Sequence, residues 1–199
     1  MARYVVALTG ASGVLYGKRL VQEILAAGSE VALLISRPGW LVLEHEEALQ
    51  ADQAERLEVL RRWLRVGREA PLAYYENEDL LAPVASGSHR WQALIVVPAS
   101  MACVAAVAHG SASNLIERTA DVALKERRPL ILVPREMPLS LVHLRNLVAA
   151  AEAGAIIAPA MPGFYHQPKT VDEVVDFVVG KVLDLLGIEH RLFRRWGGG

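Results

Sequence analysis

Short apolar runs alternate with helical segments along this chain. The runs are continuously apolar and do not alternate with polar residues, which is typical of strands covered on both faces of a sheet. Alternation of strands and helices predicts a parallel sheet with helices on both sides. We therefore predict one Rossmann-like α/β domain over residues 1–199, with three α/β/α layers, a mainly parallel sheet and a loose tail at residues 197–199. The predicted strands are Tyr4–Leu8, Glu30–Ser36, Ala93–Pro98, Pro129–Pro134 and Gly154–Pro159.

Polar residues mark several helix boundaries. Thr170 to Glu173 matches the capping-box pattern, and Asn114 to Glu117 is a similar arrangement. Ser140 can cap a further helix, which Gly154 closes. The other predicted helices span Gly13–Ala27, a stretch from about Leu41, and Ala54–Val66, after which Ala70–Ser88 is predicted to be irregular.

The composition is apolar for a globular chain of 199 residues. Hydrophobic residues make up 53%, and the mean hydropathy is +0.26, so the chain either enters a membrane or buries surface against other copies of itself. Residues 93–116 carry no Lys, Arg, Asp or Glu, but Pro98 and Gly110 interrupt them, so we predict a strand, a turn and a helix and no membrane span. A net charge of −1 gives no field to attract nucleic acid, and the single Cys103 fits the cytoplasm.

Ligands of open parallel sheets bind at the carboxyl ends of the strands. The first strand ends in Gly10-Ala11-Ser12-Gly13, whose amides could meet an anion at a helix start, although a plain turn is as good a reading. Ser36-Arg37 follows the second strand, where dinucleotide-binding domains carry an acidic residue. This disfavours NAD, leaves NADP open through Arg37 and favours FMN. Ser100 offers another hydroxyl, or a simple helix cap.

Charges surround the strand Pro129–Pro134. Arg118 and Lys125 share one helix face with Asp121 between them, which indicates either a solvated salt-bridge stripe or a ligand site. Arg127-Arg128 are interpreted as cations suited to the helix C-terminus. Arg135-Glu136 follows the strand directly. An arginine can fork onto a phosphate and a carboxyl can pass a proton, so we assign this pair to a ligand.

Two loops are candidate site segments, although each could be a plain surface turn. They are Met161–Pro168, with Tyr165 and His166 at its tip, and Ala85–Ser88. The acidic cluster Asp172–Asp176 is similar to a magnesium-binding motif, but acids are favoured in the first turn of any helix. The histidines have no metal-ligand spacing, so we predict no metal site.

Six segments together resemble the UbiX-type flavin prenyltransferases, within the broader family of homo-oligomeric flavin-containing Cys decarboxylase-like proteins. They are TGASG, LIS, ASGS, NLIERTADVALKERRPLILVPRE, GFYHQP and RRW, and they span essentially the whole chain as one flavoprotein-like domain. The resemblance implies an enzyme that joins a dimethylallyl group from dimethylallyl phosphate to N5 and C6 of reduced FMN without a metal. It also implies a dodecamer with sites between subunits, and a UbiD-type decarboxylase that receives the prenylated FMN.

The resemblance also implies roles for individual residues. FMN is expected to contact Gly10, Ala11, Ser12, Ser36, Ser100, Met101, Ala102, Cys103 and Arg135. The allyl phosphate is expected among Ser86, Arg118, Lys125, Glu136, Tyr165 and Lys181, with Trp196 enclosing the site. The catalytic candidates are Ser12, Glu46, Lys125 and Glu136. Three positions depart from the family pattern: Lys181 replaces an arginine, Leu80 replaces an aromatic residue of some members, and Cys103 lacks a following hydroxyl residue.

Other functions remain open at this stage. An FMN-dependent cysteine decarboxylase shares the pattern, but its Pro-x-Met-Asn substrate clamp is absent. A non-catalytic flavin carrier would have no use for cations around a second phosphate. An NADP-dependent reductase is a weaker alternative.

Overall fold

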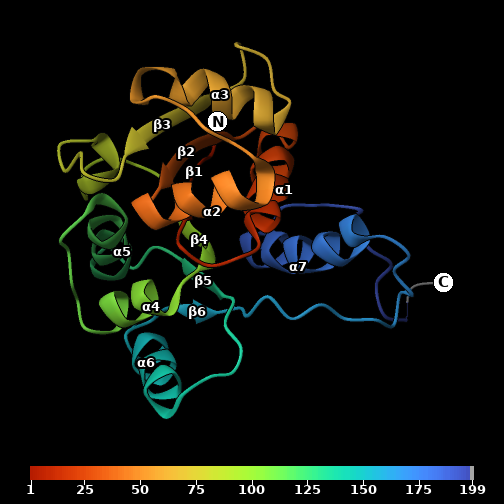
Figure 1. The fold of residues 1–199 in the computed structure, drawn as a ribbon. Coiled ribbons are helices and arrows are strands. Elements are labelled where there is room, and N and C mark those ends of the chain that lie inside the picture. Colours follow the sequence, from red (N-terminus) through yellow and green to blue (C-terminus); the bar gives the residue numbers. More distant parts are fainter. Residues whose placement is uncertain (198–199) are drawn as a thin grey trace.

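The computed structural model describes residues 1–197, within which six strands form one parallel sheet in the order β3-β2-β1-β4-β5-β6 (Figure 1). The five predicted strands are confirmed, and the Rossmann-like α/β fold is confirmed with them. Residues 198 and 199 of the predicted tail lie outside the described residues. The strands are β1 (Arg3–Leu8), β2 (Glu30–Ile35), β3 (Leu72–Glu76), β4 (Ala93–Ala99), β5 (Leu130–Pro134) and β6 (Ile156–Ile157).

Strand β3 corrects the prediction of an irregular region at Ala70–Ser88. It pairs in parallel with β2, from Val31 opposite Leu72 to Ile35 opposite Glu76. Because β3 lies at the edge of the sheet, most of its side chains are only partly buried. Its sequence, LAYYE, therefore lacks the continuous apolar run by which the central strands were found.

Helices cover both faces of the sheet and complete the three predicted layers (Figure 1). Leu20 of α1, Leu60 of α3 and Val178 of α7 belong to a core on one face, whereas Val104 of α4 and Leu115 of α5 belong to a core on the other. The helices are α1 (Val14–Ala26), α2 (Arg37–Glu47), α3 (Arg56–Leu64), α4 (Met101–Ala108), α5 (Leu115–Lys125), α6 (Leu141–Glu152) and α7 (Val171–Leu186), with short 3₁₀ turns η1 (Gln53–Glu55) and η2 (Pro83–Ala85).

The predicted caps at Asn114, Ser140 and Thr170 are confirmed, because each side chain accepts a backbone N–H at the start of its helix. Helix α2 begins at Arg37, earlier than the predicted Leu41. Ser36 caps it by accepting the Gly39 N–H, and a proline stands in its first turn. Residues 93–116 contain β4, α4 and the start of α5. No helix among residues 1–197 has the length and apolarity needed to cross a bilayer.

Thr9 joins the carboxyl ends of the two central strands. Its side chain is 3% exposed, and its hydroxyl donates to the Pro98 carbonyl at 2.8 Å while accepting the Ser100 N–H at 2.7 Å. The turn after β1 is therefore fixed relative to the start of α4. Buried polar groups that lose such partners cost free energy, so this clamp also matters for stability.

We predict that Thr9→Val lowers the free energy of unfolding by about 1–3 kcal/mol, because it leaves the partly buried Ser100 N–H and the Pro98 carbonyl without their partner. Thr119→Val is the matched control. Thr119 is also fully buried, but its hydroxyl only donates to the Leu115 carbonyl one turn earlier in α5. Denaturant unfolding of both variants measures the difference. An equal decrease in the free energy of unfolding would show that the Thr9 clamp contributes no more than an ordinary buried hydroxyl.

Candidate active site

Arg135 bridges the ends of three strands. Its backbone N–H donates to the Ala99 carbonyl at the end of β4, and its Nε donates to the Ser12 carbonyl, 3.2 Å away, in the turn after β1. Together with the Thr9 clamp, these bonds close a ring across β1, β4 and β5. The ring brings Ser12 and Arg135, two residues expected to contact FMN, next to each other at the edge of the sheet where ligands of such folds bind.

The side chain of Glu46, a residue of α2, binds the backbone at the N-terminus of α1. Its carboxylate accepts the Gly13 N–H at 3.0 and 3.1 Å and the Val14 N–H at 3.1 Å. These amides were predicted to meet a ligand anion, and the structure gives them a carboxylate of the chain. The positive end of the helix dipole suits that carboxylate. Glu46, which comes from the last turn of α2, consequently binds the turn that carries Ser12, another of the catalytic candidates.

Two other helix N-termini reach the same edge. Ser36 and Ser100 act as caps: their hydroxyls accept the Gly39 N–H at 3.0 Å and the Cys103 N–H at 3.3 Å. Capping still leaves the first amides of each helix without intrahelical acceptors, among them those of Met101 and Ala102 in α4. Glu46 accepts the free N–H groups at the start of α1, but the carboxyl edge of the sheet still offers the free N–H groups at the starts of α2 and α4 to an anion.

The turn after β1 packs closely against α2. A Cβ at Gly10 would lie 2.5 Å from the Pro38 Cβ, so a side chain cannot be added there without moving α2. Tyr16, in the first turn of α1, is a neighbour that the sequence analysis missed. Burial raises the pKa of its phenol, although Arg135 opposes this. The only sequence signal for Tyr16 is its position after the glycine turn.

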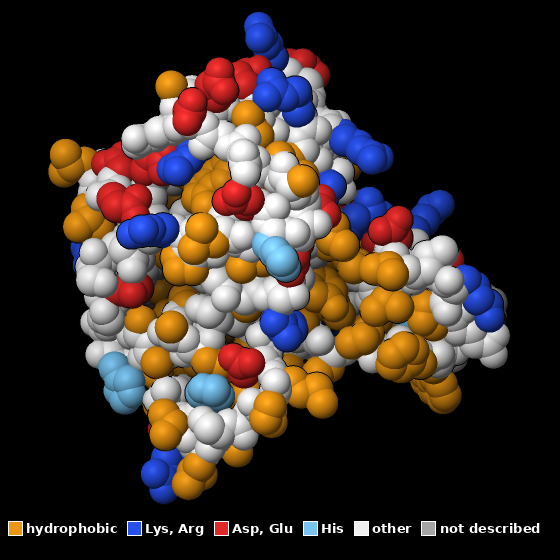
Figure 2. Space-filling view, in the orientation of Figure 1, with side chains coloured by type: hydrophobic (Ala, Val, Ile, Leu, Met, Phe, Trp, Pro, Cys, Tyr) orange, Lys and Arg blue, Asp and Glu red, His pale blue; other side chains and the backbone are white. Residues whose placement is uncertain are grey.

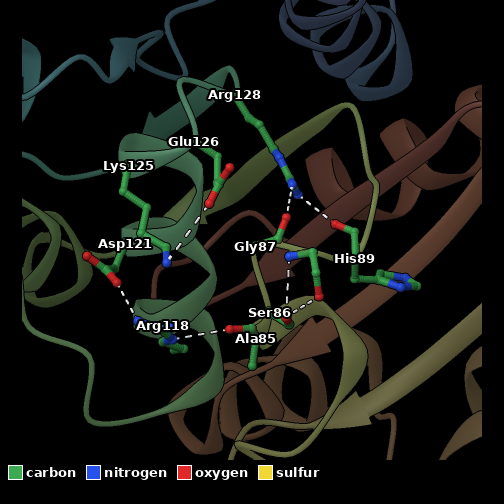
Figure 3. Close-up of polar contacts among 10 residues, drawn as sticks. Ala85, Ser86, Gly87, His89, Arg118, Asp121, Lys125, Glu126 and Arg128 are labelled. Carbon is green, nitrogen blue, oxygen red and sulfur yellow. Dashed lines mark hydrogen bonds and ion pairs between the residues drawn. The ribbon is translucent and has the colours of Figure 1, made fainter.

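Ser86, Arg118 and Lys125 form a second group around the turn 85–89 (Figure 3). Arg118 donates through Nε to the Ala85 carbonyl at 3.2 Å and pairs with Asp121 at 2.6 Å. The Arg118–Asp121 pair is the one contact expected of the alternative salt-bridge stripe, and the assignment of Arg118 to a ligand stays a prediction. Lys125 differs, because its recorded neighbour is the Glu126 carboxylate at 4.0 Å.

Tyr165 and Trp196 form a third group in the C-terminal region. Their rings meet edge to face, with centroids 5.3 Å apart, and Lys181 lies on α7 with its Nζ 3.6 Å from Asp184. Helix α5 and the C-terminal segment lie on opposite sides of the molecule (Figure 1). Within residues 1–197, no hydrogen bond or ion pair joins the second and third groups. One chain therefore does not gather all the predicted allyl-phosphate residues.

Glu136 lies two residues after the end of β5. In the sequence it falls between the second group and the third group. It is exposed, and within residues 1–197 its carboxylate accepts only the neighbouring Met137 N–H, at 3.2 Å. Beside it lies a mainly apolar cavity of about 450 Å³. Neither Arg135 nor Glu136 takes part in an ion pair within the described part of the chain. The lining includes Arg135, Glu136, Pro138, Leu139, Leu147 and Met161.

Two further candidates are Cys103 and the acidic cluster Asp172–Asp176. Burial raises the pKa of the Cys103 thiol to about 12, which disfavours its thiolate form. Glu173 serves the cap of α7, since its carboxylate accepts the Lys169 N–H, and Asp176 pairs with Arg19 at 2.6 Å. The first-turn interpretation of the acidic cluster is confirmed for Glu173. Across residues 1–197, no three His, Cys, Asp or Glu side chains are grouped so that they could hold a metal ion.

A parallel sheet with hydroxyls, open amides and an arginine at its carboxyl edge is the arrangement of a nucleotide-binding α/β protein. Residues 1–183 match the Flavoprotein family, so the chain is a member of that class. A flavin prenyltransferase UbiX from Halalkalibacterium halodurans is 48% identical over 194 residues, which cover 98% of this chain and 93% of the relative. The chain therefore belongs to the family of UbiX flavin prenyltransferases.

Solved structures agree with this assignment. AnUbiX (PadA1), crystallised in complex with FMN and dimethylallyl pyrophosphate, is 37% identical, with a TM-score of 0.87 and coverage of 100% of this chain and 98% of its own. A dodecameric FMN-dependent Ubix-like decarboxylase from Escherichia coli O157:H7 is 38% identical, with a TM-score of 0.85 and coverage of 98% and 100%. The predicted family and fold are confirmed by these similarities.

Proposed function

We propose that this chain joins a dimethylallyl group from dimethylallyl phosphate to N5 and C6 of reduced FMN, releasing phosphate and prenylated FMN. The observation that carries the proposal is the state of Arg135 and Glu136 at the mouth of β5. A half-buried guanidinium and an exposed carboxylate stand there beside an apolar cavity, with no ion-pair partner within residues 1–197. Such a pair suits an anionic ligand and a proton transfer.

The donors at the strand edge fit FMN. The starts of α2 and α4 offer a serine hydroxyl and open amides for a phosphate or a polar ring edge. The position after β2 holds Ser36 and Arg37, so it lacks the carboxylate that a dinucleotide ribose needs. FMN supplies the nucleophilic nitrogen and ring carbon when it is bound. We assign its binding to Gly10, Ala11, Ser12, Ser36, Ser100, Met101, Ala102, Cys103 and Arg135.

The other residues handle charge and protons. Lys125 neutralises the departing phosphate, and Glu136 passes a proton to it and later accepts one during ring closure. The Glu46 carboxylate accepts the Gly13 and Val14 N–H groups at the α1 N-terminus and so holds the turn that carries Ser12. Arg118, Ser86, Tyr165 and Lys181 bind the phosphate, and Trp196 covers the site.

The proposed phosphate site needs more than one copy of the chain. Ser86, Arg118 and Lys125 lie on one side of the molecule and the C-terminal group on the other (Figure 1). Exposed hydrophobic side chains cover α6 and the C-terminal region, as Figure 2 shows. Leu141 and Val142 are 61% and 62% exposed, and Trp196 is 81% exposed. We propose that these surfaces pack together in a homo-oligomer, with twelve copies expected, and so complete the site.

Further parts of the proposal concern the chain's surroundings. A UbiD-type decarboxylase receives the prenylated FMN, and the protein works in the cytoplasm without a metal. Neither nucleic acid nor a membrane is a partner. A net charge of −1 supports the first of these two exclusions.

Anaerobic incubation of the protein with reduced FMN and dimethylallyl phosphate tests the reaction. We expect mass spectrometry of the released flavin to show FMN enlarged by one dimethylallyl unit, together with free phosphate. Dimethylallyl pyrophosphate is the parallel donor, and the faster donor defines the substrate. Unmodified flavin with both donors, from protein that binds FMN, would refute the proposal and favour the carrier. Decarboxylation of a cysteinyl substrate would favour the decarboxylase.

Arg135→Ala and Glu136→Gln should fail in different ways. Glu136→Gln keeps the shape of the side chain but cannot exchange a proton, so we expect normal FMN affinity and a single-turnover rate lower by about 10²-fold. Arg135→Ala should weaken FMN binding itself. Calorimetric titration and rapid-quench assays on both variants measure these effects. Normal turnover in Glu136→Gln would end the acid–base assignment.

A further inference from the structure

Arg128 lies behind the turn 85–89, outside the residues assigned to the reaction. The sequence analysis interpreted it as a cation at the C-terminus of α5. The structure corrects this, because its guanidinium donates to two carbonyls of the turn: to His89 at 2.8 Å and to Gly87 at 2.5 Å (Figure 3). The two terminal nitrogens of one guanidinium therefore bind two carbonyls of the same turn, those of Gly87 and His89.

The base of this arginine is itself held in place. After α5 the chain reverses through Arg127, whose φ is +55°, and the Arg128 N–H donates to the Ala123 carbonyl at 2.8 Å. The guanidinium lies 4.4 Å from the ring centre of Trp91, which is only 4% exposed. A planar cation stacked on a buried ring and forked onto two carbonyls has few alternative positions.

The turn that Arg128 holds carries Ser86. The Ser86 hydroxyl lies 2.8 Å from the Ser88 hydroxyl and accepts the Ser88 N–H at 3.3 Å. Arg118 binds the preceding carbonyl, that of Ala85, at 3.2 Å. Two arginines thus hold the turn. Arg118 binds it at its start, and Arg128 binds it at its middle and its end (Figure 3).

We propose that Arg128 is a positioning residue for the allyl-phosphate site. It fixes the turn 85–89, so that the Ser86 hydroxyl stands in place beside Arg118 and Lys125 before the phosphate arrives. This inference rests on the proposed function of Ser86, and it assigns Arg128 no contact with the substrate. A lysine at 128 would keep the charge but lose the fork and the stacking.

The test compares Arg128→Lys with Arg127→Lys in the full-length, FMN-loaded protein. Arg127 is the matched control, because it is exposed and its side chain makes no hydrogen bond or ion pair within residues 1–197. For Arg128→Lys we expect the KM for dimethylallyl phosphate to rise roughly tenfold, the loss that accompanies one or two hydrogen bonds. The kcat at saturating substrate and the Kd for FMN should stay near wild type. Arg127→Lys should change none of these.

A double variant separates positioning from general damage. If Arg128 acts through Ser86, Ser86→Ala with Arg128→Lys should be no worse than the poorer single variant. Fully additive losses, or a fall in FMN affinity and melting temperature that parallels the change in KM, would overturn the inference. So would a KM equal to that of Arg127→Lys.

Hydrogen exchange provides a readout that does not depend on catalysis. Amides of the segment 83–91 should exchange faster in Arg128→Lys than in Arg127→Lys or wild type. Unchanged exchange would overturn the positioning role even if the enzyme were active. If wild type transfers no prenyl group while exchange still responds to Arg128→Lys, the proposed function fails and Arg128 is only a structural clamp, which also overturns the inference.

Discussion

The buried hydroxyl of Thr9 is the contact on which the site depends. It links the end of β1 to the end of β4 through Pro98 and Ser100, and Arg135 extends the link to β5 through Ala99 and back to Ser12. Loops at the carboxyl edge of a parallel sheet are free to diverge unless something joins them. Here a closed ring of hydrogen bonds sets the spacing of the three loops, and the proposed flavin edge is the surface that this ring presents.

The same geometry is consistent with the proposed division of the allyl-phosphate site between copies of the chain. The ring holds Ser12, Arg135 and Glu46 together in one chain. The groups assigned to the allyl phosphate are not joined in this way, because the α5 group and the C-terminal group lie on opposite sides of the molecule (Figure 1). The chain has 53% hydrophobic residues and exposed apolar side chains on α6. This apolar surface is available for contacts between copies. Assembly and catalysis would then depend on the same surfaces.

The sequence predicted the central sheet because its strands are buried on both faces and are apolar throughout. It missed β3, whose edge position leaves Tyr74, Tyr75 and Glu76 half-buried. Helix starts were predictable where a hydroxyl or amide caps the helix, as at Asn114 and Thr170.

Long-range side-chain contacts were less accessible from the sequence. The resemblance named Glu46, but no local pattern shows that its carboxylate reaches a helix 32 residues away. Arg128 looked like a helix-terminal cation, and only the fold reveals its two carbonyl partners. Local propensity records neither contact, because both depend on how distant segments pack.

Complementation between inactive variants tests the shared site most directly. Lys125→Ala alters the α5 group and Lys181→Ala alters the C-terminal group, so each alone removes a proposed phosphate-binding cation and should inactivate every site of its own assembly. Co-expression with two different tags, followed by purification through both, yields mixed assemblies. If one site draws these groups from two copies, random mixing should restore about a quarter of wild-type turnover. Mixed assemblies as inactive as either parent, beside an active wild type, would place the whole site in one chain and contradict the account.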